Sequence, residues 1–157
     1  MAFKAYTKKY DKIIDAPITK CYVGEPTQDL NQDLRINEFR GLWDTGATCS
    51  LISSRTATLL GLTPVSKTTI GHANGQSVVN MYNISIVLPN DVLLPFIEVA
   101  EGAFSNFDLL IGMDIITKGD LSISNKDEKT TFSFRIPSHK ETDFVAEYHE
   151  IEAKNIC

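Results

Sequence analysis

The sequence predicts an all-β domain with a few short helices. Apolar, β-branched and aromatic runs alternate with Gly, Pro, Asn and Asp turn signals at short intervals, which is typical of β-rich folds. Over residues 82–88, Tyr82, Ile84, Ile86 and Leu88 alternate with Asn83, Ser85 and Val87, which is the two-residue period of a half-buried strand. At 157 residues, with 43% of them apolar, the chain has the size of one ordinary domain and can bury a core.

The first part of the chain predicts three strands after a polar start. Residues 1–15 are mixed and polar, and we expect an N-terminal arm of uncertain order. Residues 16–23 predict a first strand, and residues 34–36 and 39–44 predict a hairpin. In the return strand Asp44 follows an apolar neighbour on its own face, so its carboxylate should be partly desolvated.

A short helix and a second hairpin follow. Serines at the start of residues 53–60 can cap a helix of one or two turns that ends at Gly61. Residues 68–70 and 76–79 flank Asn74-Gly75, and Asn-Gly is the strongest local hairpin signal. We expect this hairpin to project, with a small and polar tip.

The central part predicts two more strands and then the most apolar stretch of the chain. Residues 92–99 follow the alternating strand, and Pro95 predicts that they lie at a sheet edge, because proline cannot donate a ladder hydrogen bond. Residues 107–116 predict a buried strand, a tight turn at Gly112 and a short helix. These elements are expected to surround the core.

The last part predicts a hairpin and a helical extension. Residues 121–124 and 130–136 form the two hairpin strands. We therefore place the folded domain at residues 16–137. Residues 138–157 are a C-terminal extension with apolar side chains at helical spacing, predicted to be an amphipathic helix, with a frayed tail as the alternative. Its apolar residues are Phe144, Val145, Tyr148 and Ile151.

Charge and hydropathy exclude several classes of function. The net charge is −5, and no cluster of Lys and Arg is longer than Lys8-Lys9, so no binding to nucleic acid is expected. The N-terminus has no apolar signal-peptide core, and no run approaches membrane-spanning length. We expect a soluble, cytoplasmic protein with no membrane partner.

The cysteines and histidines show no ligand spacing. The cysteines are odd in number and form no CxxC pair, which argues against both a disulfide framework and a metal site. No cofactor is expected, and Cys49 is interpreted as a small buried residue. The residues concerned are Cys21, Cys49, Cys157, His72, His139 and His149.

Residues 41–53 carry the strongest chemical signal. An apolar strand breaks into a tight loop at Asp44-Thr45-Gly46, and such loops are where scaffolds expose reactive groups. The triplet alone is a moderate signal, since Asp and Gly are both common in ordinary turns. Its context in the rest of the chain has to decide.

Four features follow one another in the chain: the motif over residues 42–50, Leu60-Gly61-Leu62, the hairpin over residues 69–79 and a second signature over residues 110–116. In these features, over about residues 34–136, the chain resembles the retropepsin-like aspartic proteases, single-domain relatives of the pepsins. Met113 and Thr48 stand where viral members often have an ion pair, so the resemblance is to cellular and bacterial members. The resemblance implies a closed, barrel-like acid-protease fold.

The resemblance also implies a role for each matching residue. The hairpin tip would be a flap that closes on substrate, and a hydrogen bond would join Ser50 to Asp114. The implied catalytic residues are Asp44, Thr45 and Gly46. The implied substrate-binding residues are Ala47, Thr48, Ile70, Gly71, His72, Ala73, Asn74 and Gly75. The implied structural residues are Ser50, Gly112 and Asp114.

The chain contains a single Asp-Thr-Gly, which is half of an aspartic protease site. The resemblance therefore implies a homodimer that cleaves polypeptide, with Asp44 paired to its copy across a two-fold axis. A catalytically silent dimerisation or peptide-binding module with the same fold is the alternative. A proenzyme, in which residues 1–15 or the C-terminal helix mask the cleft or the dimer face, is a third reading.

Overall fold

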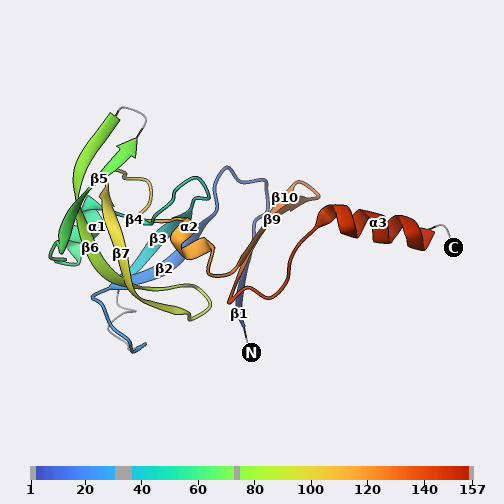
Figure 1. The fold of residues 1–157 in the computed structure, drawn as a ribbon, viewed down its shortest axis with the longest axis horizontal. Helices are drawn as coiled ribbons and strands as arrows, with labels where there is room; N and C mark the ends of the chain where they lie inside the picture. The colour runs from blue at the N-terminus through green and yellow to red at the C-terminus, as the bar shows by residue number, and fades with distance from the viewer. Residues whose placement is uncertain (1–2, 31–36, 73–74, 156–157) are drawn as a thin grey trace.

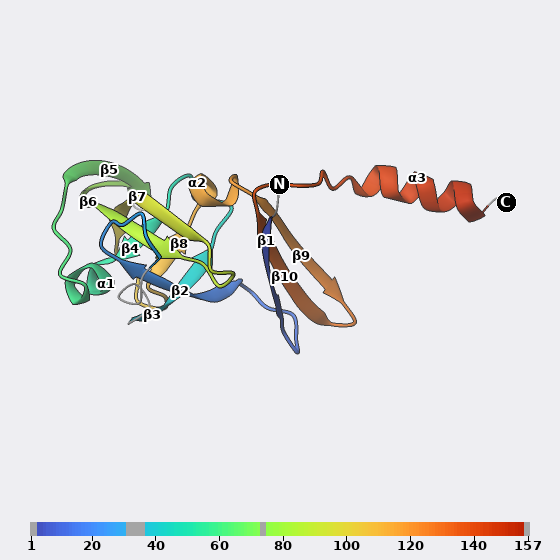
Figure 2. The same cartoon turned by 90° about the horizontal axis from the view of Figure 1, so that it is seen from below.

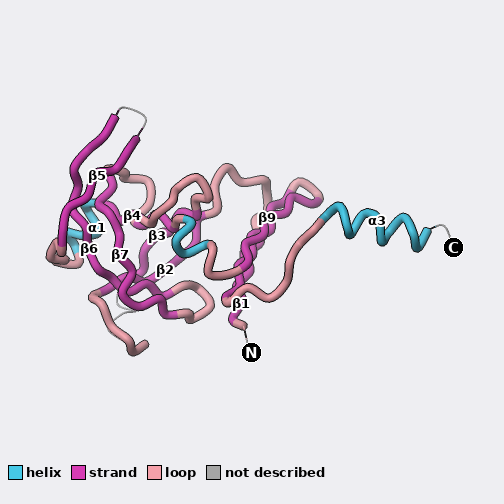
Figure 3. Tube along the Cα trace, in the orientation of Figure 1, coloured by secondary structure: helices cyan, strands magenta, loops and turns pink. Residues whose placement is uncertain are grey.

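The computed structural model describes residues 3–30, 37–72 and 75–155, and these form ten strands and three helices (Figures 1 and 3). The predicted strand at residues 34–36 lies outside the described residues. The strands are β1 Lys4–Lys9, β2 Ile18–Gly24, β3 Glu38–Trp43, β4 Leu51–Ser53, β5 Ser66–His72, β6 Gly75–Val87, β7 Leu93–Gly102, β8 Leu109–Ile111, β9 Asp120–Lys126 and β10 Lys129–Ile136. The helices are α1 Ser54–Leu59, α2 Met113–Ile116 and α3 Phe144–Asn155.

Seven strands form one sheet that closes into a barrel. Their order is β2-β3-β8-β4-β7-β6-β5, and a further pairing of β2 with β6 completes the circle. Strand β5 pairs only with the first half of β6, so the two project from the barrel as a hairpin (Figure 1). The predicted all-β, barrel-like fold is confirmed, and large aliphatic side chains such as Ile52, Ile84 and Ile111 are fully buried in it.

Two strands differ from the prediction. The segments at residues 76–79 and 82–88 form the single strand β6, whose two halves serve the hairpin and the barrel. Strand β7 lies between β4 and β6, so its predicted edge position is wrong. Proline is tolerated because Pro95 and Phe96 bulge outward opposite Ser85, and Phe96 has a positive φ of 53°.

A second, three-stranded sheet has the order β1-β10-β9 and lies beside the barrel (Figure 2). Residues Lys4–Lys9, predicted as part of an arm of uncertain order, form its strand β1 and pair with β10. Phe132 and Phe134 of β10 are buried, and their rings lie 5.2 and 4.7 Å from the ring of Trp43. The Trp43 side chain therefore joins the two sheets.

The C-terminal extension contains helix α3, which stands away from both sheets (Figures 1 and 2). Residues 138–143 before it have no regular secondary structure, so the helical prediction is confirmed for the second part of the extension only. None of the helices among the described residues is long and apolar enough to cross a membrane.

Candidate active site

The candidate site lies where two parallel strands end side by side. Strand β3 pairs with β8 so that Trp43 lies opposite Ile111, and the chain leaves both strands at the same edge. The Asp44 N–H donates to the Ile111 carbonyl oxygen at 3.0 Å. This pairing brings the loop after β3 next to the turn at Gly112.

Asp44 is the first residue of the loop after β3, and it is half-buried while Thr45 and Gly46 are exposed. The Gly46 N–H donates to the Asp44 carboxylate oxygen Oδ1 at 2.8 Å. A Cβ at position 46 would lie only 3.1 Å from that oxygen, which explains the glycine. The Ala47 N–H donates to the Asp44 carbonyl at 3.3 Å and closes the turn. The carboxylate is thus oriented by its own loop.

A buried serine locks this loop to the second signature. Ser50 is fully buried, and its hydroxyl donates to Asp114 Oδ1 at 2.8 Å, so the hydrogen bond predicted from the sequence is present. The same hydroxyl oxygen accepts from the Gly112 N–H at 3.0 Å. A Cβ at Gly112 would lie 2.7 Å from the backbone of Cys49, so the two turns meet as closely as backbone allows.

An open cavity of about 380 Å³ lies between the loop and the β5–β6 hairpin. Four of the predicted substrate-binding residues line it, together with Gly46. Six further residues were not predicted: Cys49 belongs to the same loop, and the other five come from strands whose neighbours no local pattern reveals. The predicted ones are Ala47, Thr48, Ile70 and Gly71, and the additional ones are Cys49, Leu51, Thr68, Thr69, Met81 and Ala100.

The predicted flap is described only in part. Strand β5 reaches His72 and strand β6 begins at Gly75, and these two residues are paired. Ala73 and Asn74 lie outside the described residues, as does the side chain of His72. The cavity under the hairpin is lined by none of the residues 3–14 or 137–155, so the described parts of the two terminal segments do not occupy it.

The two described cysteines lie in different environments. Cys49 is exposed at the cavity, so its prediction as a buried residue is wrong. It stands in the loop, where backbone contacts hold the turn and leave its side chain outside. Cys21 is buried behind Gly41, and burial raises the pKa of its thiol to about 12.

A groove of about 270 Å³ lies beside Asp44, between the barrel and the terminal strands. Leu121 and Ile123 of β9 form one wall, and Ile123 is 47% exposed. The remaining lining residues are Asp15, Ala16, Pro17, Leu42, Trp43, Asp44 and Thr45. Asp44 thus lines this groove, whereas residues 46–49 of the same loop line the cavity under the hairpin.

A buried carboxylate behind the site was not predicted. Asp108 accepts from the Arg40 N–H at 2.9 Å and from the Arg55 guanidinium at 3.1 Å. Its side chain thereby ties strand β3 to helix α1, and the Ser53 hydroxyl caps that helix by accepting from the Thr56 N–H. Asp108 fixes the scaffold and does not face the cavity. Within the described ranges, no group of three or more His, Cys, Asp or Glu side chains could hold a metal ion.

Comparison with known proteins identifies similar sequences and folds. A family model described as "gag-polyprotein putative aspartyl protease" matches residues 33–118, more than half of the chain. A search of curated proteins returns no match. The crystal structure of a retropepsin-like aspartic protease from Rickettsia conorii aligns with a TM-score of 0.52 at 12% identity, covering 86% of this chain and 96% of that one. At this identity the likeness shows the fold.

Two further solved structures align with lower scores. The retroviral protease-like domain of Ddi1 from Leishmania major has a TM-score of 0.47 at 17% identity, with 76% of this chain and 92% of that chain covered. The EIAV protease complexed with the inhibitor HBY-793 has a TM-score of 0.48 at 17% identity, with 65% and 86% covered.

Proposed function

The chain belongs to the family of gag-polyprotein aspartyl proteases, and from that premise we propose that it is an aspartic endopeptidase active as a homodimer. One observation carries the proposal. Asp44 follows the barrel strand β3, and backbone N–H groups of its own loop hold it in place. The Gly46 N–H orients its carboxylate, and the Ala47 N–H donates to its carbonyl oxygen. A loop so firmly fixed around one half-buried carboxylate is suited to presenting that carboxylate to a reacting group.

The proposed chemistry needs two carboxylates. One ionised carboxylate takes a proton from water, and the water oxygen attacks the carbonyl carbon of the peptide bond. The other, protonated carboxyl gives its proton to the carbonyl oxygen. The tetrahedral intermediate then collapses: the carbon–nitrogen bond breaks, the nitrogen takes the proton that the first carboxylate received from water, and the second carboxylate takes a proton from one of the two hydroxyls. Two carboxyls about 3 Å apart suit this role, because like charges so close share one proton.

The second carboxylate is proposed to be Asp44 of another copy. Supporting this, Thr45 and Gly46 are exposed at the loop tip, and the groove beside them is open. The exposed Ile123 on its wall is an apolar side chain that a partner could cover. We propose that a second copy of the chain covers the side of the loop that faces this groove and brings the two carboxylates together.

The proposed substrate is an extended polypeptide. The cavity under the hairpin has an open mouth and is lined by small and apolar side chains together with Thr48, Thr68 and Thr69. An extended peptide would pair with the strand edge and place alternate side chains in such cavities. The hairpin tip, Gly71 to Gly75, is proposed as the flap that closes over it and excludes water.

The proposed catalytic unit is residues 16–137, with β1 completing the terminal sheet. We also propose the cytoplasm as its compartment. The thiols of Cys21 and Cys49 are both free, as is usual in a reducing environment.

A peptide-library digest tests the proposed function. Native chain and Asp44→Asn are incubated with the same library across acidic and neutral pH, and the products are identified by mass spectrometry. The proposal expects cleavage by the native chain only, blocked by a statine-type transition-state mimic. A stable dimer that cleaves no peptide would favour the silent binding module instead.

A further inference from the structure

Among the residues that the structure describes, helix α3 packs against no other element of its own chain. Every residue from 144 to 154 is exposed, and the helix is 12 residues long. A helix of this length is marginal in water by itself and is normally held by packing of an apolar face. Phe144, Tyr148 and Ile151 follow each other at spacings of four and three residues, and they are 76%, 57% and 50% exposed. They form one apolar stripe, flanked by Val145.

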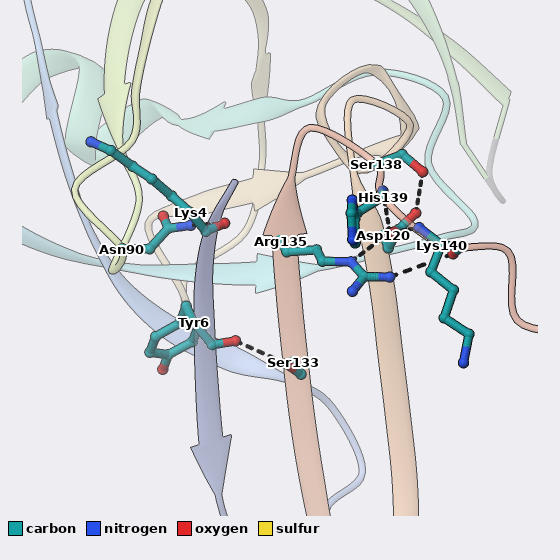
Figure 4. Close-up of polar contacts among 9 residues, drawn as sticks. All are labelled: Lys4, Tyr6, Asn90, Asp120, Ser133, Arg135, Ser138, His139 and Lys140. Atoms are coloured by element: carbon teal, nitrogen blue, oxygen red, sulfur yellow. Dashed lines mark hydrogen bonds and ion pairs between the residues drawn. The ribbon is translucent and has the colours of Figure 1, made fainter. Parts of the chain in front are cut away.

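The segment that precedes the helix, residues 138–140, is nevertheless hydrogen-bonded to the terminal sheet (Figure 4). The Asp120 carboxylate at the start of β9 accepts from the backbone N–H groups of His139 and Lys140 at 2.8 and 3.3 Å. It also accepts from the Ser138 hydroxyl and from Arg135 Nε, the latter at 2.6 Å. These donors, the His139 N–H foremost, hold the pKa of Asp120 well below its usual value. The direction in which the extension leaves the sheet is therefore set.

Three parts of the chain differ in their balance of charged residues. The barrel, residues 15–117, carries five Lys and Arg against eleven Asp and Glu. The terminal region, residues 3–14 and 118–136, carries eight against four and is the positive part. Helix α3 carries three Glu and one Lys, with Glu147 and Glu152 on either side of its stripe. An acidic helix is attracted to the terminal region and repelled by the barrel.

We infer that α3 is an intermolecular arm that packs its apolar stripe on the basic terminal region of a second copy of this chain. The inference rests on the homodimer proposed above, since the groove beside Asp44 has the terminal strand β9 as one wall. The terminal region offers an exposed apolar side chain at Ile13, 56% exposed, which follows the exposed Lys12 in the sequence and belongs to the same region as the exposed Lys9. The arm thus adds contact area and a charge match to the catalytic dimer.

Sedimentation velocity over a range of concentrations tests the arm. All variants carry Asp44→Asn so that no cleavage alters the full-length chain. Replacing Phe144, Tyr148 and Ile151 together by Ser should raise the dimer dissociation constant at least about tenfold. The matched control, Ala146→Ser with Ala153→Ser on the opposite side of α3, should stay within about twofold. Circular dichroism checks that helix content is equal in both. A stripe variant that dimerises like the control overturns the inference.

A charge exchange locates the docking surface. Glu147→Lys with Glu152→Lys should weaken the dimer, as should Lys9→Glu with Lys12→Glu. The four changes combined in one chain should recover most of the affinity, because the attraction is restored with reversed signs. Failure to recover means that the helix binds elsewhere, on another surface or another protein, and overturns the inference.

The experiments can contradict the proposed arm and the proposed endopeptidase activity independently of each other. If the native chain cleaves peptides and the stripe variant dimerises unchanged, the arm falls and the endopeptidase stands. If dimerisation depends on the stripe but the native chain cleaves nothing, the endopeptidase falls and the arm stands.

Discussion

The barrel and the terminal region differ in how far one chain completes them. The barrel closes on itself through the β2–β6 pairing, and its core is fully buried. The terminal sheet keeps two open edges, β1 and β9, and continues into a helix whose side chains are exposed. The proposed dimer fits this difference, because the barrel is completed within one chain while the terminal region leaves strand edges and helix side chains accessible to another molecule.

The loop that carries Asp44 belongs to the part that one chain completes. Asp44 is held by Ile111 and Gly46, and Ser50 locks the loop to Asp114. These hydrogen bonds all lie within one chain, whereas the proposed chemistry needs a second carboxylate. The predictions below separate what one chain supplies from what a second chain adds.

The largest effect is expected at the carboxylate itself. Asp44→Asn keeps the shape of the side chain but removes the base, and general acid–base groups contribute rate factors of up to about 10⁴. We expect kcat/KM to fall at least about a thousandfold, with the urea midpoint almost unchanged. Asp11→Asn, an exposed acid in the terminal region, serves as the control. Residual activity near the native level in Asp44→Asn would remove the carboxylate from the mechanism.

The next effect contrasts a buried with an exposed phenylalanine. Phe132 is fully buried against Trp43 and joins the two sheets, so Phe132→Ala should lower the free energy of unfolding by about 3–5 kcal/mol. Phe144→Ala on the exposed helix should change it by less than about 0.5 kcal/mol in dilute protein. Urea unfolding followed by circular dichroism compares the two, and equal losses would contradict the described packing.

A smaller effect is expected from the hydrogen bonds that join Ser50 to Asp114 and Gly112. Ser50→Ala leaves the Gly112 N–H without its acceptor and Asp114 without its donor, which costs about 1–3 kcal/mol. Because the catalytic loop is loosened, kcat should fall as well. Ser53→Ala removes the cap of α1 and costs about 1 kcal/mol without moving the loop. An equal fall of kcat in both variants would mean that general destabilisation, rather than the lock, is being measured.

The smallest effect is expected at the hydrogen bonds between Asp120 and residues 138–140, the segment that precedes α3. The pKa of Asp120 is lowered on folding, so its contribution to stability is present above its ordinary value of 3.8 and is lost as the pH falls toward the lowered one. Asp120→Asn should free the His139 and Lys140 amides at neutral pH, with little change in global stability. NMR spectra of the two amides report this, and native protein should show the same release only in strong acid. Amide shifts that do not respond to the substitution would rule out the anchor.

Much of the site could be predicted because its signals are local. The tight loop at Asp44, the capping serine of α1 and Gly61, which has a φ of +63° at the helix end, each follow from nearby residue types. The hydrogen bond between Ser50 and Asp114 came from a resemblance between motifs, because no local rule links residues 64 positions apart.

The errors lie where tertiary pairing decides. Pro95 suggested an edge, but barrel closure placed β7 inside the sheet and a bulge accommodated the proline. Polar residues at the N-terminus hid strand β1, whose pairing with β10 depends on a partner more than 120 residues away. Met81 and Ala100 line the cavity for the same reason, since they are opposite each other only in the folded sheet.

The central claim is that one chain holds half of a catalytic site, and subunit mixing tests it most directly. Native chain at a fixed total concentration is mixed with increasing fractions of Asp44→Asn, allowed to exchange, and assayed for peptide cleavage. If both copies must supply Asp44, activity falls as the square of the native fraction, because mixed dimers are inactive. A decrease in simple proportion to the native fraction would contradict the account, since each chain would then carry a complete site.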